Sequence, residues 1–90
     1  MHMDIEWDTD KAASNLKKHG VSFDEATSAV LDPQALALED PTTVGEHRWI
    51  LLGMSDQLRL LTVVYTLRDE ERVRLISARK ATRKEAENYA

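Results

Sequence analysis

The chain has 90 residues, 42% hydrophobic and 31% charged, with a formal net charge of −4 and no cysteine. This length allows one domain, residues 1–90, and the lack of cysteine excludes a disulfide scaffold, a zinc finger and thiol chemistry. No segment has the apolar run of a signal peptide or the roughly 20 apolar residues of a membrane span. We therefore expect a cytoplasmic protein that does not enter a membrane.

The first third of the chain predicts a β-prone segment at residues 4–7, followed by two short helices at residues 9–18 and 23–31. Asp8 is a suitable N-cap for the first helix, and Gly20 is typical of its C-terminal end. Ser22 and Glu25 have the spacing of a capping box, in which each side chain binds the other residue's backbone N–H. Pro33 ends the second helix.

Four strands and a final helix are predicted next, at residues 35–39, 48–55, 59–68, 72–79 and 82–89. The links between the strands are short, which favours an antiparallel meander. Thr82 and Glu85 form a second capping box at the start of the last helix. The sequence therefore predicts an α+β fold, with two N-terminal helices packed on one face of a four-stranded antiparallel sheet and a short C-terminal helix.

Alternation along the 59–68 strand predicts which way its side chains point. The face expected to join the core carries Leu61, Val63, Tyr65 and Leu67. The other face is mixed and expected to be partly wet, with Leu60, Thr62, Val64, Thr66 and Arg68. A sheet covered by helices on one side leaves this mixed face free for RNA or a protein.

Positive charge is concentrated near the C-terminus. Residues 72–90 hold six Lys or Arg and two Glu, a formal +4, whereas residues 1–71 carry a formal −8. Arg79 and Lys80 end the last strand just before the N-terminus of the final helix, whose backbone N–H groups also favour anions. Nucleic acid is the first partner to consider. The alternative is that these cations only balance nearby carboxylates, as surface charges commonly do.

Other kinds of site have little support in the sequence. His2, His19 and His47 lie far apart, without the spacing of a metal site. There is no Gly-rich phosphate loop and no nucleophile-elbow motif around a serine. We therefore expect neither a metal nor another cofactor.

Three strings, KHGVSF, VVYT and ISARKA at residues 18–23, 63–66 and 76–81, occur in an order that resembles the BrnT toxins of type II toxin–antitoxin systems. The resemblance extends from Ile5 to Tyr89. It implies a fold like that of the RelE ribonuclease toxins and RNA cleavage that inhibits translation. It also implies a BrnA antitoxin with a ribbon-helix-helix domain, and DNA binding only through the complex of toxin and antitoxin.

The resemblance suggests a metal-independent reaction in which a ribose 2′-hydroxyl attacks the adjacent phosphate. Such a reaction needs a proton acceptor, a proton donor and cations that stabilise the extra phosphate charge. Arg79 is the first choice for the charge stabiliser, followed by Arg68 and Arg59. The candidates for proton transfer are Tyr89, His19 and His47, and those for RNA binding are Lys80, Arg83, Lys84 and Arg74.

Two classes of function stay open at this point. One is a metal-independent endoribonuclease toxin. The other is a non-enzymatic interaction module whose basic end binds an antitoxin or another acidic partner.

Overall fold

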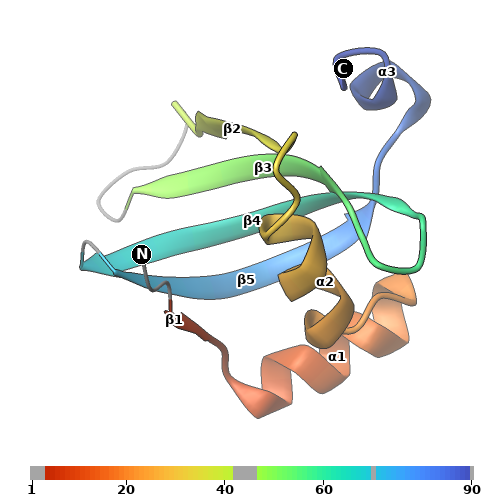
Figure 1. Ribbon diagram of the computed structural model, residues 1–90. Helices are drawn as coiled ribbons and strands as arrows, with labels where there is room; N and C mark the ends of the chain where they lie inside the picture. Colours follow the sequence, from red (N-terminus) through yellow and green to blue (C-terminus); the bar gives the residue numbers. More distant parts are fainter. Residues whose placement is uncertain (1–3, 42–46, 70, 90) are drawn as a thin grey trace.

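The computed structural model describes residues 4–41, 47–69 and 71–89 (Figure 1). The helices are α1 (Thr9–His19), α2 (Phe23–Val30) and α3 (Arg83–Ala86). The strands are β1 (Asp4–Glu6), β2 (Leu36–Glu39), β3 (Arg48–Met54), β4 (Leu60–Asp69) and β5 (Arg72–Lys80). They form one sheet in the order β1-β5-β4-β3-β2, and the predicted α+β class is confirmed. Within the described ranges, no helix is long and apolar enough to cross a membrane.

The prediction of a four-stranded antiparallel sheet was wrong in one respect, because β1 is a fifth strand and makes the sheet mixed. β1 runs parallel to β5, with Ile5 opposite Val73, whereas all the other pairings are antiparallel. Ile5 packs against the core, so this short strand gains stability from burial as well as from hydrogen bonds. Three residues are too few to show an alternating pattern, and the partner strand lies far away in the sequence.

The helix caps follow the sequence closely, with one exception. The Asp8 side chain accepts a hydrogen bond from the Asp10 N–H, and Gly20 ends α1 with a left-handed φ of 71°. The Ser22 side chain accepts a hydrogen bond from the Glu25 N–H at 3.0 Å. The second bond of the box, from the Ser22 N–H to the Glu25 carboxylate, is not formed, because that carboxylate accepts from Ser55 and Arg59 instead. Both halves of the box between Thr82 and Glu85 are present, although α3 ends earlier than predicted.

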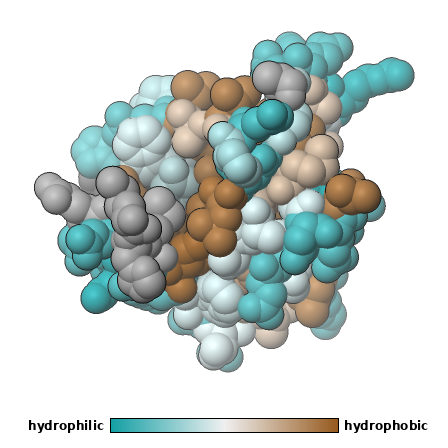
Figure 2. All heavy atoms as spheres, viewed as in Figure 1, coloured by the Kyte–Doolittle hydropathy of each residue, from teal (hydrophilic) through white to brown (hydrophobic). Residues whose placement is uncertain are grey.

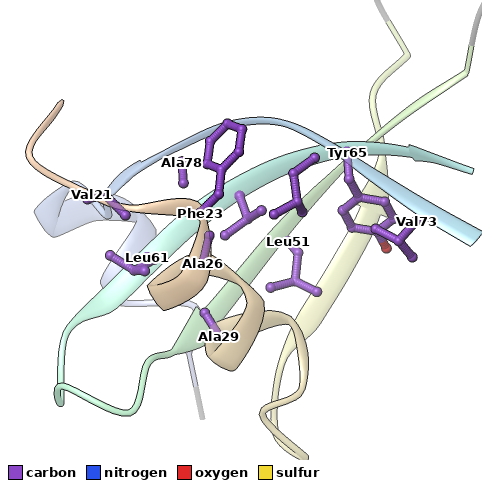
Figure 3. Close-up of a cluster of buried hydrophobic side chains, with 11 residues drawn as sticks. Val21, Phe23, Ala26, Ala29, Leu51, Leu61, Tyr65, Val73 and Ala78 are labelled. Carbon is purple, nitrogen blue, oxygen red and sulfur yellow. The ribbon is translucent and has the colours of Figure 1, made fainter. Parts of the chain in front are cut away.

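Both N-terminal helices pack on the same face of the sheet, as predicted (Figure 1). The buried side chains of α2 and the preceding turn point at those of β3, β4 and β5 (Figure 3). Gly53 allows a close approach here, since a Cβ atom at this position would lie 2.3 Å from the Ala29 carbonyl oxygen. The core consists of Val21, Phe23, Ala26, Ala29, Leu51, Leu61, Val63, Tyr65, Val73, Leu75 and Ala78.

A buried amide fixes α1 to the sheet. Asn15 is 6% exposed, and its side-chain nitrogen donates to the Ala78 carbonyl at 2.9 Å while its oxygen accepts from the Ala78 N–H at 3.1 Å. β1 pairs only with residues 72–74, so it leaves the rest of that edge of β5 without a neighbouring strand among the described residues. At Ala78, the two bonds from Asn15 take the place of the hydrogen bonds that such a strand would make. They satisfy backbone groups that would otherwise be buried unpaired.

The face of the sheet opposite α1 and α2 is called the open face below. As predicted, Leu61, Val63 and Tyr65 point into the core, but Leu67 is 47% exposed. The face of β4 that was expected to be partly wet is less exposed to solvent than expected, because Thr62 and Thr66 are only 3% and 1% exposed. By register, the open face carries Leu36, Leu38, Arg48, Ile50, Leu52, Thr62, Val64, Thr66, Arg74 and Arg79.

Hydrophobic residues are not spread evenly over the surface. In the view of Figure 2 they gather in a band across the middle of the molecule, between hydrophilic residues. On the open face, Leu36, Leu38 and Ile50 are 43%, 75% and 37% exposed and lie side by side across β2 and β3. Contiguous apolar surface of this kind is typical of a binding site.

Candidate nucleic-acid interface

A β-bulge decides the direction in which Arg79 points. Tyr65 lies opposite Leu75 and the neighbouring Val64 lies opposite Ser77, so Ile76 is an extra residue in β5. Strict alternation from Leu75 would turn Arg79 toward the helices. The bulge reverses the alternation and aligns Arg79 with Thr62 on the open face.

Arg79 is held at two points by one carboxylate. Its Nη1 donates to Glu85 Oε1 at 2.8 Å, and its Nη2 donates to Oε2 at 2.9 Å. The same carboxylate accepts bonds from the Thr82 N–H at 2.8 Å and from the Thr62 hydroxyl at 3.0 Å. Four donors therefore converge on one small anion, and a phosphate group offers comparable acceptor oxygens.

This arrangement strongly favours the charged forms of both partners. The Arg79 guanidinium, assisted by the Thr82 N–H and the Thr62 hydroxyl, lowers the pKa of Glu85 from its ordinary 4.5 to about 2. Glu85 in turn raises the pKa of Arg79. The pair is nevertheless accessible, with 41% of the Arg79 side chain and 31% of the Glu85 side chain exposed. An external anion can therefore compete for Arg79.

An apolar pocket of about 530 Å³ adjoins the Arg79–Glu85 pair on the open face. Thr62 and Glu85 belong both to its wall and to the group of side chains around Arg79. The remaining lining residues come from β2, the turn after it, β3 and the C-terminal segment: Leu36, Leu38, Glu39, Pro41, Ile50, Leu52 and Asn88.

Arg74 lies on the same face, nearer to β1. Its Nη1 donates to Glu6 Oε2 at 2.8 Å, and Arg72 Nε lies 3.3 Å from Glu6 Oε1. Thr66 is the register partner of both Arg74 and Arg48, and its buried hydroxyl has no hydrogen-bond partner among the described residues. The register partners of Arg74 and Arg79 in β4 are Thr66 and Thr62, which are four residues apart. The two arginines are therefore separated by roughly 13 Å along the strand.

Arg59 has a different environment from Arg79. Its Nε donates to Glu25 Oε2 at 2.8 Å, and its Nη2 contacts Glu25 Oε1 and donates to the Gly20 carbonyl at 3.1 Å. The Ser55 hydroxyl donates to the same carboxylate at 2.7 Å. Glu25 is 3% exposed, and its pKa is lowered chiefly by Arg59. Arg59 thus links α2 to the turn between β3 and β4 rather than facing the pocket.

The other predicted RNA-binding cations are dispersed. Lys80 is the neighbour of Arg79 in sequence but lies on the opposite face, because its register partner is the core residue Leu61. Its charge acts on Glu25 instead. Arg83 and Lys84 are exposed in α3, next to the Arg79–Glu85 pair in the chain.

Arg68 is exposed near the far end of β4, where a second irregularity leaves it without a register partner in β5. No ion pair joins Arg68 to another described residue. Of the three predicted charge stabilisers, only Arg79 therefore contacts a residue that lines the pocket on the open face, namely Glu85.

The three candidates for proton transfer are not brought together. The Tyr89 hydroxyl donates to Asp32, which raises the pKa of Tyr89. His19 ends α1 on the helix-covered side and borders a separate pocket of about 200 Å³. His47 Nδ1 contacts Glu39, which lines the 530 Å³ pocket.

Two residues close to Arg79 were missed as site residues in the sequence. Glu85 was recognised as the capping residue of the last helix and as one of the carboxylates that the cations could balance, and Thr62 only as part of a mixed face. The capping box itself contained a usable indication, since it fixes a carboxylate next to the end of the strand that carries Arg79. Among the described residues, no group of three His, Asp or Glu side chains could hold a metal ion.

Comparison with known proteins agrees with the resemblance noted in the sequence. A family model described as "Ribonuclease toxin, BrnT, of type II toxin-antitoxin system" matches residues 7–85. Among solved structures, the crystal structure of the Brucella abortus ribonuclease toxin BrnT is similar, with 26% identity and a TM-score of 0.66. The match covers 90% of this chain and 99% of that one. No curated protein matches the chain.

Proposed function

The chain belongs to the BrnT family of ribonuclease toxins of type II toxin–antitoxin systems, and from this premise we propose that it cleaves RNA without a metal ion and thereby inhibits translation. The observation that carries the proposal is the cluster of Arg79, Glu85 and Thr62 beside the pocket on the open face. A cation, a carboxylate and a hydroxyl in contact are suited to transfer of a phosphoryl group between oxygens.

In the proposed reaction, a phosphate of the RNA displaces Glu85 from Arg79. The guanidinium stays protonated and can grip two phosphate oxygens at once, so it stabilises the extra negative charge of the transition state. Glu85, released from its main partner, regains part of its ordinary pKa and becomes a stronger proton acceptor. Displacement therefore prepares both groups in one step.

The 2′-hydroxyl oxygen then attacks the phosphorus, and Glu85 takes its proton. The bond from phosphorus to the 5′-oxygen breaks, and that oxygen takes a proton from solvent. The products are a 2′,3′-cyclic phosphate and a 5′-hydroxyl end. Because the nucleophile belongs to the RNA itself, the reaction does not depend on a metal-bound water.

The test is cleavage of a single-stranded RNA by the purified protein in the presence of a chelator. We expect cleavage with cyclic phosphate ends, and none of an RNA whose riboses are replaced by 2′-deoxyribose. Activity that is lost on chelation and restored by a divalent ion, with the RNA structure controlled, would refute the metal-independent mechanism.

A toxin of this family acts with an antitoxin, and we infer that the partner is a BrnA-like ribbon-helix-helix protein. A contiguous apolar area beside a cation supports an antitoxin with apolar and acidic segments that covers the open face. We expect the complex, but not the toxin alone, to bind operator DNA. Tight, sequence-specific DNA binding by the purified toxin would contradict this.

A non-enzymatic interaction module is the second candidate. The observation that favours it is that Arg59, Arg74 and Arg79 are all paired with carboxylates. Under this alternative, toxic expression would proceed without detectable RNA cleavage.

A further inference from the structure

The pocket of about 530 Å³ beside Arg79 has no role in the reaction proposed above. We propose that it binds the base of the nucleotide next to the phosphate held by Arg79, and that it sets the base preference of cleavage. This inference rests on the proposed function. It follows first from continuity, because Thr62 and Glu85 line the pocket and also contact each other beside Arg79. A base and its own phosphate are joined through one sugar, so their sites must be neighbours.

The chemistry of the lining fits a nucleobase. Leu36, Leu38, Ile50 and Leu52 provide an apolar surface for the faces of the ring. Asn88 provides an amide that can both donate and accept hydrogen bonds at the ring's polar edge. Ligand pockets commonly combine a mainly apolar wall with a few polar groups that fix orientation.

The charges around the pocket argue against a second phosphate there. Its two carboxylates, Glu85 and Glu39, are paired with Arg79 and His47 in the free protein, and Glu85 loses its cation when a phosphate displaces it from Arg79. No cation among the described residues lines the pocket, so its interior favours an uncharged group. In an RNA chain, the base is the uncharged part.

The first experiment measures binding of a short single-stranded oligonucleotide that contains 2′-deoxyribose and is therefore not cleaved. Leu38→Ser removes an apolar contact in the pocket, and we expect it to weaken binding by roughly 10-fold. Leu58→Ser is the matched control, since Leu58 is 84% exposed, Leu38 is 75% exposed, and Leu58 does not line the pocket. Both changes affect exposed side chains, so both variants should fold.

Oligonucleotides with one abasic nucleotide identify what the pocket holds. At one position, removal of the base should weaken binding to the wild type but should not weaken binding to Leu38→Ser further. Equal effects of base removal in both proteins at every position would overturn the proposal, whether or not the protein cleaves RNA.

The second experiment compares cleavage sites in a mixed-sequence RNA pool. Asn88→Asp replaces an amide donor with an acceptor. We expect the relative rates of cleavage at different bases to change by roughly 10-fold, so that another base is preferred. An unchanged base preference in an active Asn88→Asp protein would count against the proposed role of the pocket and leave the proposed function intact.

If Leu38→Ser instead weakened only antitoxin binding, the pocket would be a protein-binding site and the inference would be wrong. Failure of the wild type to cleave any RNA would count against the proposed function. The binding experiment does not depend on cleavage, so it would still test the pocket.

Discussion

Among the described residues, two arginine–glutamate pairs are joined at two points each, and they lie on opposite faces of one sheet. Arg59–Glu25 lies on the helix-covered face, with only 2% of the glutamate side chain exposed. Arg79–Glu85 lies on the open face, with 31% of the glutamate and 41% of the arginine side chain exposed. The first pair connects α2, the Gly20 carbonyl and the turn after β3, whereas the second connects the end of β5 to α3 and borders a pocket.

The difference shows that access, rather than the identity of the pair, decides what such a pair can do. A carboxylate buried as deeply as Glu25 would be left uncompensated if its arginine moved, which is strongly unfavourable. An exposed pair contributes little to stability and exchanges readily with solvent ions. We therefore propose that Arg59–Glu25 stabilises the fold and that Arg79–Glu85 serves ligand binding.

The largest expected effect is on RNA cleavage by Arg79→Ala. Loss of the guanidinium should reduce cleavage by about 10²–10³, because the proposed two-point contact of Arg79 with the phosphate would be lost. Arg79→Lys should restore little, since one ammonium cannot reproduce that contact. Cleavage is measured by single-turnover kinetics, with Lys17→Ala as the matched control of charge, because Lys17 is an exposed cation of α1.

The folding of the same variant separates the two interpretations of Arg79. If Arg79 binds RNA, Arg79→Ala should melt within a few degrees of the wild type and still bind the antitoxin through the apolar residues Leu36, Leu38 and Ile50. Full activity in a folded Arg79→Ala protein would eliminate the site assignment, although not membership of the family.

Arg59→Ala should show the opposite behaviour. It leaves Glu25 buried without its cation, so the melting temperature should fall by roughly 10–20 °C at neutral pH. The loss should shrink as the pH is lowered, because an uncompensated buried carboxylate has a raised pKa and becomes neutral. Thermal melts at several pH values test this. A change of less than a few degrees would show that the two pairs do not differ as described.

A smaller effect is expected for the pH dependence of Glu85. Its folded pKa of about 2 lies below the ordinary 4.5, so its stabilising contribution is fully present above about pH 4.5 and is lost as the pH falls toward 2. Glu85→Gln should therefore melt below the wild type at neutral pH, by roughly 2–5 °C for an exposed pair. The difference should vanish only below about pH 2, where Glu85 is protonated in the folded protein as well. Other carboxylates titrate in both proteins and cancel.

Much of the fold could be predicted because its determinants are local. Asp8, Gly20 and the Thr82–Glu85 box mark helix ends with nearby residues alone, and the alternation in β4 identified most of the core face. β1 was missed as a strand of the sheet because its pairing with β5 joins distant segments. Only the folded chain brings them together.

The candidate site was harder to predict because its geometry depends on one bulge. Arg74 and Arg79 are five residues apart, a spacing that puts two side chains on opposite faces of a regular strand. The extra residue Ile76 brings them to the same face and sends Lys80 to the other. Nothing in the segment around Ile76 marks a bulge, so a set of adjacent cations in the sequence was predicted as one site although the structure divides it.

The most direct test of the different roles of the two pairs is an NMR titration with the non-cleavable 2′-deoxy oligonucleotide, in which the side-chain carboxyl carbons of Glu85 and Glu25 are followed against pH. We expect bound oligonucleotide to raise the pKa of Glu85 from about 2 toward 4.5, because Arg79 has exchanged its carboxylate for a phosphate. The pKa of Glu25 should stay low, because Arg59 does not move. Saturated binding with an unchanged Glu85 pKa would contradict the account.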